Sequence, residues 1–314
     1  MSDASRAVGR PPEEGVPGGL PPCVVFEDDD LLVVHKPPGW NTHAPAPFAG
    51  EGIHEWLKHR EPRWSRLAIV HRLDKDTSGL LVFGKSPEAN RSLTAQFARR
   101  EVGKEYHCVT DRPVPSEAWI VRSGMVRVGD RYATAPEGTG ERAETRFRLM
   151  RRDGALSWLA VEPVTGRTHQ IRVHAASQGL PLLGDRLYGG APAPRLHLHA
   201  ARLTVAHPRD GRAMTWEVPA EFDRTPAASL RSAILRPEET SAWRVAHGSS
   251  DDAPGVYAER WADSLLIEAE TSPVEAEESR LREWISRRAG NEAGQASGIY
   301  FKALRRQVRQ TAPA

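Results

Sequence analysis

Short apolar runs separated by turn-forming residues are the feature that most constrains the fold of this chain. Its 314 residues include 26 glycines and 25 prolines, which favour turns and interrupt long helices. The runs between them are rich in apolar and β-branched residues, as is typical of strands. We expect strands at residues 23–26, 31–36, 80–83, 106–110, 119–122, 145–149, 156–161, 196–205 and 214–218. Many strands with few helices predict an α+β fold with a mixed, mainly antiparallel sheet.

Helices are predicted at three places between these strands. The first is expected at residues 53–60. A second begins after Ser86, whose hydroxyl can cap the first turn, and Pro87 suits the first helical position. A third is predicted at residues 168–178, because Gly179 is a good residue for ending a helix.

Charge and cysteine content narrow the class of protein. Lys and Arg number 43 against 41 Asp and Glu, a net charge of +2, so overall charge does not indicate a nucleic-acid partner. Neither Cys23 nor Cys108 belongs to a CxxC pair of the kind that binds zinc. The first 20 residues lack the apolar stretch of a signal peptide, and no apolar run is long enough to cross a membrane. These features predict a cytoplasmic, soluble protein.

The most informative stretch is residues 71–79, HRLDKDTSG, directly before the apolar run LLVF. Two acids, basic residues and small residues lie there in a turn before a buried strand, where catalytic groups are often found. From these residues alone, a capped turn with surface charges is an equally good interpretation. The segment is not a kinase catalytic loop, and the chain lacks a glycine-rich phosphate loop and a GxSxG elbow.

Residues 71–85, HRLDKDTSGLLVFGK, resemble the signature of the RluA-type pseudouridine synthases. Further motifs agree with this family in order and spacing. They are Lys104-Glu105-Tyr106, GRTHQIRVH at residues 166–174, GDRLYG at 184–189, LHLHA at 196–200 and HKPPG at 35–39. The resemblance covers residues 22–222 and implies the pseudouridine synthase sheet domain.

The resemblance implies a reaction and three catalytic residues. Pseudouridine synthases break the C1′–N1 bond of uridine, turn the base and rejoin it through C5, without a metal or an organic cofactor. Asp74 matches the nucleophile, and Arg172 matches the arginine that forms an ion pair with it. Tyr106 matches the tyrosine that packs on uracil, and its hydroxyl is a candidate for removing the C5 proton. Asp76 is the nearest alternative nucleophile, but the motif places Asp74 in the catalytic position.

The resemblance implies structured RNA as the partner. A uridine inside an RNA helix must be turned out of the base stack to reach a pocket. Arg72 matches a family residue that fills the vacated place in the base stack, which suits a planar guanidinium. Arg167 either contacts phosphate or supports its own motif. His71 and Lys104 are also predicted to contact RNA.

Two basic segments are further candidates for RNA contact, since basic side chains neutralise phosphates and aromatic ones stack on bases. The first carries Lys58, Arg60, Arg63, Arg66 and Arg72, with Trp56 and Trp64 between them. The second carries Arg91, Arg99, Arg100 and Lys104. The alternative for the first segment is a solvated helix and loop with two tryptophans that serve packing.

Several histidines raise the question of a metal site. His169 and His174 are five residues apart, whereas two ligands on one helix face are four apart. His197 and His199 share one face of a predicted strand. We expect these histidines to be hydrogen-bonded structural residues, and we expect no metal site.

The chain is predicted to form two domains after a lead-in. Residues 1–21 are rich in Gly, Pro and charge and are expected to be disordered. Residues 22–225 form the predicted synthase domain, and residues 240–314 form a second, small α+β domain. Within the latter, a helix is expected at residues 273–288 and a strand at residues 299–302.

The second domain resembles the PUA-like leading module of certain rRNA cytosine-5 methyltransferases. The likeness rests on WRVAHG at residues 243–248 and APGVYAERW at residues 253–261. Glu259 and Trp261 stand where that family has Asp and Tyr. No methyltransferase catalytic domain follows, so we expect no methyl transfer. The alternative is a small acidic domain used for packing.

Taken together, these motifs predict an RNA pseudouridine synthase that acts on rRNA or tRNA, as a monomer. The second resemblance favours rRNA. One alternative is an RNA-binding protein without catalysis, and another is the front part of a bifunctional synthase and methyltransferase. The presence of Asp74, Tyr106 and Arg172 favours the enzyme.

Overall fold

The computed structural model describes residues 20–46, 50, 52–269 and 298–304. The chain divides into two compact units, Met1–Asp223 and Arg224–Ala314, which are described separately. The predicted disordered lead-in lies outside the described residues except for its last two. The predicted helix at residues 273–288 lies outside them entirely.

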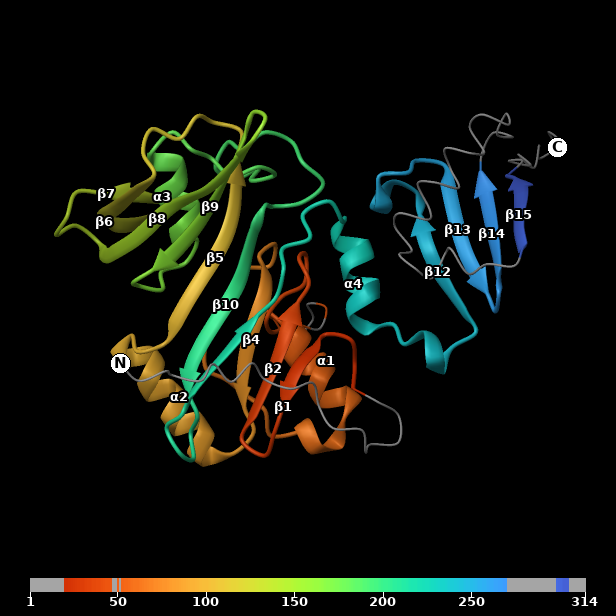
Figure 1. The fold of residues 1–314 in the computed structure, drawn as a ribbon, viewed down its shortest axis with the longest axis horizontal. Coiled ribbons are helices and arrows are strands. Elements are labelled where there is room, and N and C mark those ends of the chain that lie inside the picture. Colours follow the sequence, from red (N-terminus) through yellow and green to blue (C-terminus); the bar gives the residue numbers. More distant parts are fainter. Residues whose placement is uncertain (1–19, 47–49, 51, 270–297, 305–314) are drawn as a thin grey trace, which may run out of the picture. The chain divides into compact units, whose positions relative to one another are not determined.

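The first unit is built on an eleven-stranded sheet (Figure 1). Its strands are β1 (Val24–Glu27), β2 (Leu31–Lys36), β3 (Ala68–Ile69), β4 (Ser78–Gly84), β5 (Gly103–Thr110), β6 (Ala118–Val128), β7 (Arg131–Ala135), β8 (Glu141–Asp153), β9 (Leu156–Pro163), β10 (Leu198–Ala206) and β11 (Ala213–Glu217). Their order is β1-β2-β4-β10-β5-β9-β8-β6-β7, with β3 beside β4 and β11 beside β10. Among these pairings, β4 with β10 is parallel and the others are antiparallel. The predicted mixed, mainly antiparallel sheet is confirmed, and β3 and β7 are additions to it.

Three α-helices belong to this unit: α1 (Ile53–Arg60), α2 (Pro87–Arg99) and α3 (Gln170–Ser177), with the short 3-10 helix η1 (Pro62–Trp64). Ser86 caps α2 as predicted, because its hydroxyl accepts a hydrogen bond from the backbone N–H of Ala89 at 3.1 Å. α3 begins two residues later than predicted, because His169 adopts a left-handed backbone with a φ of 56°. Regular helical geometry cannot include such a residue.

Strand β4 is buried on both faces. Leu80 and Val82 belong to the same apolar cluster as Leu93 of α2. Leu81 and Phe83, on the opposite face, belong to a cluster that includes residues of α1. Burial on both faces explains why the sequence there is a continuous apolar run rather than an alternating one.

The parallel contact between β4 and β10 is short, and it depends on a glycine. Ser78 pairs with His199 and Gly79 with Ala200. Gly79 has a φ of +120°, and a Cβ there would lie within 2.7 Å of Ala200 backbone atoms. Only glycine accepts this conformation and this approach. Because β4 begins at this contact, the loop before it opens at the middle of the sheet.

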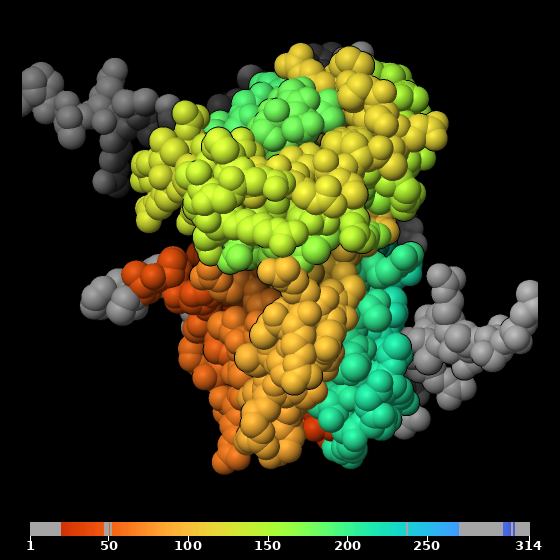
Figure 2. All heavy atoms as spheres, turned by 90° about the vertical axis from the view of Figure 1, so that its left-hand side faces the viewer, coloured from red at the N-terminus to blue at the C-terminus, as the bar shows by residue number. Residues whose placement is uncertain are grey.

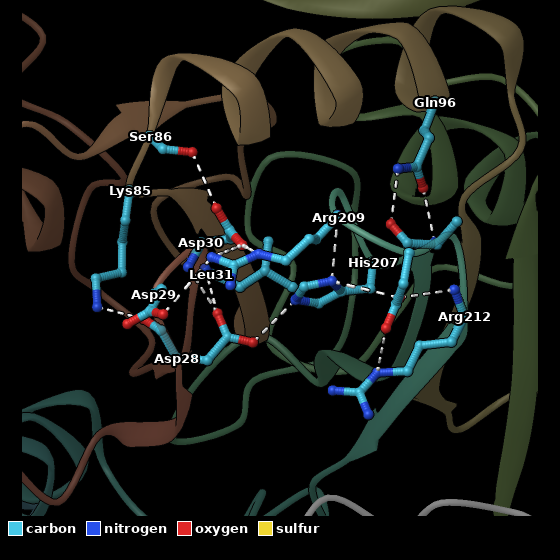
Figure 3. Close-up of polar contacts among 12 residues, drawn as sticks. Asp28, Asp29, Asp30, Leu31, Lys85, Ser86, Gln96, His207, Arg209 and Arg212 are labelled. Carbon is cyan, nitrogen blue, oxygen red and sulfur yellow. Dashed lines mark hydrogen bonds and ion pairs between the residues drawn. The ribbon is translucent and has the colours of Figure 1, made fainter.

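A polar network connects the β1–β2 turn, helix α2 and the turn that follows β10 (Figure 3). His207, after β10, contacts Asp28 of the β1–β2 turn through Nε2 at 3.0 Å. Arg209 donates to Asp30 at 3.0 Å. Gln96 of α2 bonds both the N–H and the C=O of Ala206 at 2.8 Å. The network fixes α2 and the β10–β11 turn against the β1–β2 hairpin.

The second unit contains α4 (Pro226–Ile234), the short helices η2 (Pro237–Glu239) and η3 (Gly248–Asp251), and a four-stranded sheet. The strands are, in sheet order, β12 (Ala242–His247), β13 (Val256–Trp261), β14 (Ser264–Ala269) and β15 (Gly298–Ala303). β15 contains the strand predicted at residues 299–302. Asp251 of η3 accepts hydrogen bonds from Thr225, which caps the start of α4, at 3.1 Å, and from Arg231 in its last turn at 2.6 Å. It also accepts one from the N–H of His247, the last residue of β12, at 2.7 Å.

Candidate active site

A cleft of about 1400 Å³ lies in the first unit between the loop before β4, the end of α2 and the start of α3. Figure 2 shows the yellow-green residues of β6–β9 above and gold α2 below. The seven residues that the sequence singled out all line this cleft: Asp74, Tyr106, Arg172, Arg72, Arg167, His71 and Lys104. Motifs that are distant in sequence therefore meet in one place.

Contacts to the backbone on either side of Asp74 hold its loop in place. The Thr42 hydroxyl donates to the C=O of Leu73 at 3.0 Å and accepts from its N–H at 3.1 Å. Lys36 is fully buried and donates to the C=O of Lys75 at 3.0 Å. Burial lowers the pKa of Lys36 to about 7. Asp74 is thus presented to the cleft on a supported loop, with 27% of its side chain exposed.

Arg172 lies beside Asp74, but its closest carboxylate belongs to Asp185. Nη1 of Arg172 is 3.7 Å from Oδ2 of Asp74. Its Nε and Nη2 donate to the two oxygens of Asp185 at 2.7 and 2.8 Å. The expected contact with Asp74 therefore exists as a long ion pair, and Arg172 bridges two carboxylates.

Asp185 is a residue that the sequence reasoning missed. Its side chain is fully buried, and a buried carboxylate requires a charged or hydrogen-bonding partner. Besides Arg172, the backbone N–H groups of Leu187 and Tyr188 bind it at 3.2 Å. The signal was an acid inside the GDRLYG motif, 13 residues after the motif arginine.

Tyr106 extends from β5 and lines the cleft. Burial and, to a smaller extent, the Asp74 carboxylate raise the pKa of its phenol. The phenol is therefore protonated near neutral pH. It can accept a proton only by passing its own proton to another group.

The predicted RNA-binding residues differ in how they are held. Arg72 is exposed and Lys104 is half-buried, and neither forms an ion pair within the described part of the chain. Burial lowers the pKa of Lys104. Arg167 donates to Glu141 at 2.7 Å and to the C=O of Arg142 at 3.2 Å. The structure thus leaves Arg72 and Lys104 open to a partner, whereas Arg167 already has one.

His71 lines the cleft, yet its ring also serves the fold. Nε2 accepts a hydrogen bond from the N–H of Val82 at 3.1 Å. The ring stacks on Phe97 at 4.5 Å. Burial, aided by Lys104, lowers the pKa of His71 to about 3, so the ring is neutral. RNA contact by His71 remains a prediction.

The predicted stacking of bases on Trp64 is wrong. Trp64 is fully buried, and its Nε1 donates to Glu27 at 2.7 Å. Trp56 is half-buried and packs edge-on against Trp40 at 5.6 Å. Of that segment, Arg72 lines the cleft, whereas the two tryptophans and the other cations do not. Arg100 and Lys104 of the second basic segment also line it. The apolar area of the two rings is used in the core.

Two of the motif histidines, His174 and His199, have the predicted structural hydrogen bonds, whereas His197 stacks on Phe222 at 4.6 Å and its ring nitrogens have no hydrogen-bond partner among the described residues. His174 lies between Thr145 at 2.8 Å and Ser123 at 3.0 Å. His199 contacts the Ser78 hydroxyl at 2.7 Å and the C=O of Val218 at 3.1 Å. The described residues contain no group of three or more His, Cys, Asp or Glu that could hold a metal ion.

Comparison with known proteins decides the family. A family model described as RNA pseudouridylate synthase matches residues 30–177. Ribosomal large subunit pseudouridine synthase D of Pasteurella multocida (strain Pm70) is 36% identical over 227 residues, which cover 66% of this chain and 70% of that protein. The chain belongs to the RNA pseudouridine synthase family. The predicted enzyme class, an isomerase, is confirmed.

Further likenesses agree with this family. Ribosomal large subunit pseudouridine synthase C of Vibrio cholerae serotype O1 is 34% identical over 212 residues, covering 63% of this chain and 66% of that protein. The solved structure of Human RNA Pseudouridylate Synthase Domain Containing 1 has a TM-score of 0.53 and 24% identity, covering 63% of this chain and 82% of that one. It supports the pseudouridine synthase fold. Among the described residues, no helix is both long enough and apolar enough to cross a membrane.

Proposed function

We propose that this protein converts uridines of large-subunit ribosomal RNA to pseudouridine, with Asp74 as the nucleophile. The observation that carries the proposal is a carboxylate in a cleft, 3.7 Å from a guanidinium and on a loop fixed from both sides. The choice of RNA follows the two relatives, which are named as ribosomal large subunit enzymes. The family model matches residues 30–177, a range that contains Asp74, Tyr106 and Arg172.

The reaction divides into three steps in this cleft. An oxygen of Asp74 attacks C1′, or takes part in glycal formation, as the C1′–N1 bond breaks and uracil leaves with the bonding electrons. Uracil then turns, and C5 forms the new bond to C1′ as the carboxylate is released. Loss of the C5 proton and protonation of N1 restore the conjugated ring. No metal or organic cofactor is required for this sequence of bonds.

Arg172 and Tyr106 have separate roles in this proposal. The guanidinium of Arg172 lies 3.7 Å from Oδ2 of Asp74 and offsets the negative charge of the nucleophilic carboxylate. Tyr106 packs on the uracil and takes the C5 proton. Because its own pKa is raised, the phenol passes its proton to the released Asp74 carboxylate in the same step. That proton then moves to N1 of the uracil, which returns Asp74 to its starting form.

The cations at the opening of the cleft are proposed to hold the RNA. Arg72 lies two residues before the nucleophile and is exposed, so it can enter the base stack that the flipped uridine leaves. Lys104 supplies a charge for phosphate. Arg167 and His71 have contacts within the protein and are proposed to support the RNA-facing surface.

The second unit is proposed to be a PUA-like module that adds RNA contact. Two large aromatic residues support this, since Trp261 is 54% exposed and Tyr300 62% exposed, and exposed rings can stack on bases. Replacing both by alanine in the full chain is expected to weaken RNA binding without changing the rate at saturating RNA. An unchanged dissociation constant would assign the unit another role. We further propose that the enzyme acts as a monomer in the cytoplasm, where this RNA is found.

The decisive experiment compares two neighbouring carboxylates. Ribosomal RNA from a strain without this protein is incubated with wild type, Asp74→Asn or Asp76→Asn, and pseudouridine is mapped. Both substitutions remove one negative charge from the same loop, so folding and RNA binding are matched. We expect Asp74→Asn to lower the rate by at least ~1000-fold, and Asp76→Asn to retain it. An RNA-binding protein without catalysis would bind the RNA and add no pseudouridine in any of the three samples.

A further inference from the structure

His169 is held in an unusual conformation at the bottom of the cleft. Its backbone φ of 56° is rare for a residue other than glycine, and such conformations persist where surrounding structure enforces them, often at functional sites. Its ring lies between two tyrosines, with ring centroids 5.8 Å from Tyr132 and 5.7 Å from Tyr188, both edge-on. Three constraints therefore fix the direction of the imidazole.

The hydrogen bonds of Tyr188 determine which ring nitrogen of His169 carries the proton. The phenol oxygen accepts a hydrogen bond from the backbone N–H of Tyr132 at 3.1 Å. It also lies 2.8 Å from Nδ1 of His169. Within the described chain these are its two partners, and a phenol that accepts from Tyr132 and donates to Nδ1 satisfies both with its single hydrogen. A neutral imidazole that accepts at Nδ1 carries its proton on Nε2.

That Nε2–H faces the proposed nucleophile. Nε2 of His169 is 3.9 Å from Oδ2 of Asp74. Burial lowers the pKa of His169, which favours the neutral ring. Only a neutral ring has a single N–H and therefore a defined tautomer. Arg172 reaches the same oxygen, Oδ2, through Nη1 at 3.7 Å. Both distances are longer than hydrogen bonds, as is common before substrate closes a site.

Tyr188 also contacts the second donor. The guanidinium of Arg172 lies over its ring, 5.0 Å from the centroid, and Asp185 holds the other edge of that guanidinium. Asp185 in turn accepts a hydrogen bond from the backbone N–H of Tyr188. One tyrosine thus positions both groups that converge on a single oxygen of Asp74.

We propose that His169 is a positioning residue that, with Arg172, fixes Oδ2 of Asp74 and leaves Oδ1 to attack C1′, and that the Tyr188 hydroxyl sets the tautomer this requires. The inference rests on the proposed nucleophilic role of Asp74. A carboxylate with one oxygen fixed presents the other in a defined direction, which lowers the entropy lost on reaching the transition state.

Two substitutions at position 169 separate this role from a structural one. The amide nitrogen of Gln can take the place of Nε2, whereas that of Asn takes the place of Nδ1. Asn, however, tolerates the left-handed backbone better than Gln. A donor to Asp74 therefore predicts that His169→Gln is faster than His169→Asn, and a purely structural role predicts the opposite order.

The measurement is the single-turnover rate of pseudouridine formation at saturating RNA, together with the dissociation constant of the RNA. We expect His169→Asn and Tyr188→Phe to be ~10-fold to 100-fold slower than wild type, with unchanged RNA affinity. His169→Gln should recover most of the rate. Rates for Asn equal to or above those for Gln, or a Tyr188→Phe enzyme as fast as wild type, would overturn the proposal.

A second readout does not depend on turnover. Nitrogen-15 NMR of the wild-type histidines should show His169 with its proton on Nε2, and Tyr188→Phe should lose this preference. A proton on Nδ1 in wild type overturns the inference even if the enzyme is active. An inactive wild type with the Nε2 proton in place would instead contradict the proposed function and leave the tautomer assignment standing.

Discussion

The charged groups at the buried end of the cleft, here called the floor, are paired with each other, whereas the cations at its opening, here called the rim, are not. On the floor, Arg172 and Asp185 are almost completely buried and paired bidentately. On the rim, Arg72 and Lys75 are exposed and Lys104 is half-buried, and in the described part of the chain none of the three has an ion-pair partner. Buried pairs hold a geometry and are costly to break, whereas exposed charges attract phosphate at a distance and are screened by salt. We therefore expect floor substitutions to change rate and stability, and rim substitutions to change RNA affinity.

The largest effect is expected from breaking the pair on the floor. Arg172→Met leaves Asp185 buried without its charged partner, which should lower the free energy of unfolding by about 3–5 kcal/mol and abolish activity. The double variant Arg172→Met, Asp185→Asn removes the unpaired buried charge. Its amide oxygen can still accept the hydrogen bonds from the backbone N–H groups of Leu187 and Tyr188. It should regain most of the stability but none of the activity. Urea denaturation and pseudouridine assays measure both, and a stable single variant would contradict the comparison.

A smaller effect is expected where the floor meets the substrate. Tyr106→Phe keeps the ring and removes the hydroxyl proposed to take the C5 proton. The rate at saturating RNA should fall about 100-fold to 10,000-fold, while the dissociation constant stays within about twofold of wild type, since packing on uracil remains. Rapid-quench kinetics give the rate. If the loss appeared in RNA affinity instead, Tyr106 would belong with the rim.

On the rim, the expected effect is modest and depends on salt. Lys104→Gln should weaken RNA binding and lower the slope of log affinity against log salt by about 0.7–0.9, the contribution of one phosphate contact. The rate at saturating RNA should not change. Arg212→Gln is the matched control, because Arg212 is exposed between β10 and β11, pairs with Asp210 and does not line the cleft. Equal slopes for both variants would remove Lys104 from the rim.

The smallest effect on RNA is expected from Trp64, which belongs to neither region. Trp64→Phe loses the hydrogen bond to Glu27 and some buried area, and should lower the free energy of unfolding by about 1–3 kcal/mol. RNA affinity should remain unchanged within error. Thermal unfolding and filter binding measure the two quantities. A loss of affinity in a fully folded variant would restore this tryptophan to the RNA-binding surface.

Much of the fold could be predicted because its signals are local. Ser86 caps α2, and the apolar run of β4 marks a strand buried on both faces. The prediction was least accurate where tertiary contacts override local preference. Helix α3 begins later than predicted because His169 has a left-handed backbone conformation. Trp64 is buried in an apolar cluster rather than exposed to RNA.

The sequence by itself determined which residues meet in the cleft, because the family motifs mark Asp74, Tyr106 and Arg172 in order along the chain. Only the tertiary structure decided how their charges are shared. It gave Asp185 the shorter contacts with Arg172 and placed His169 towards Asp74. The physical reason is that charge pairing depends on distance and burial in three dimensions. A one-dimensional motif records that an acid and a base are present, but not which of them are neighbours.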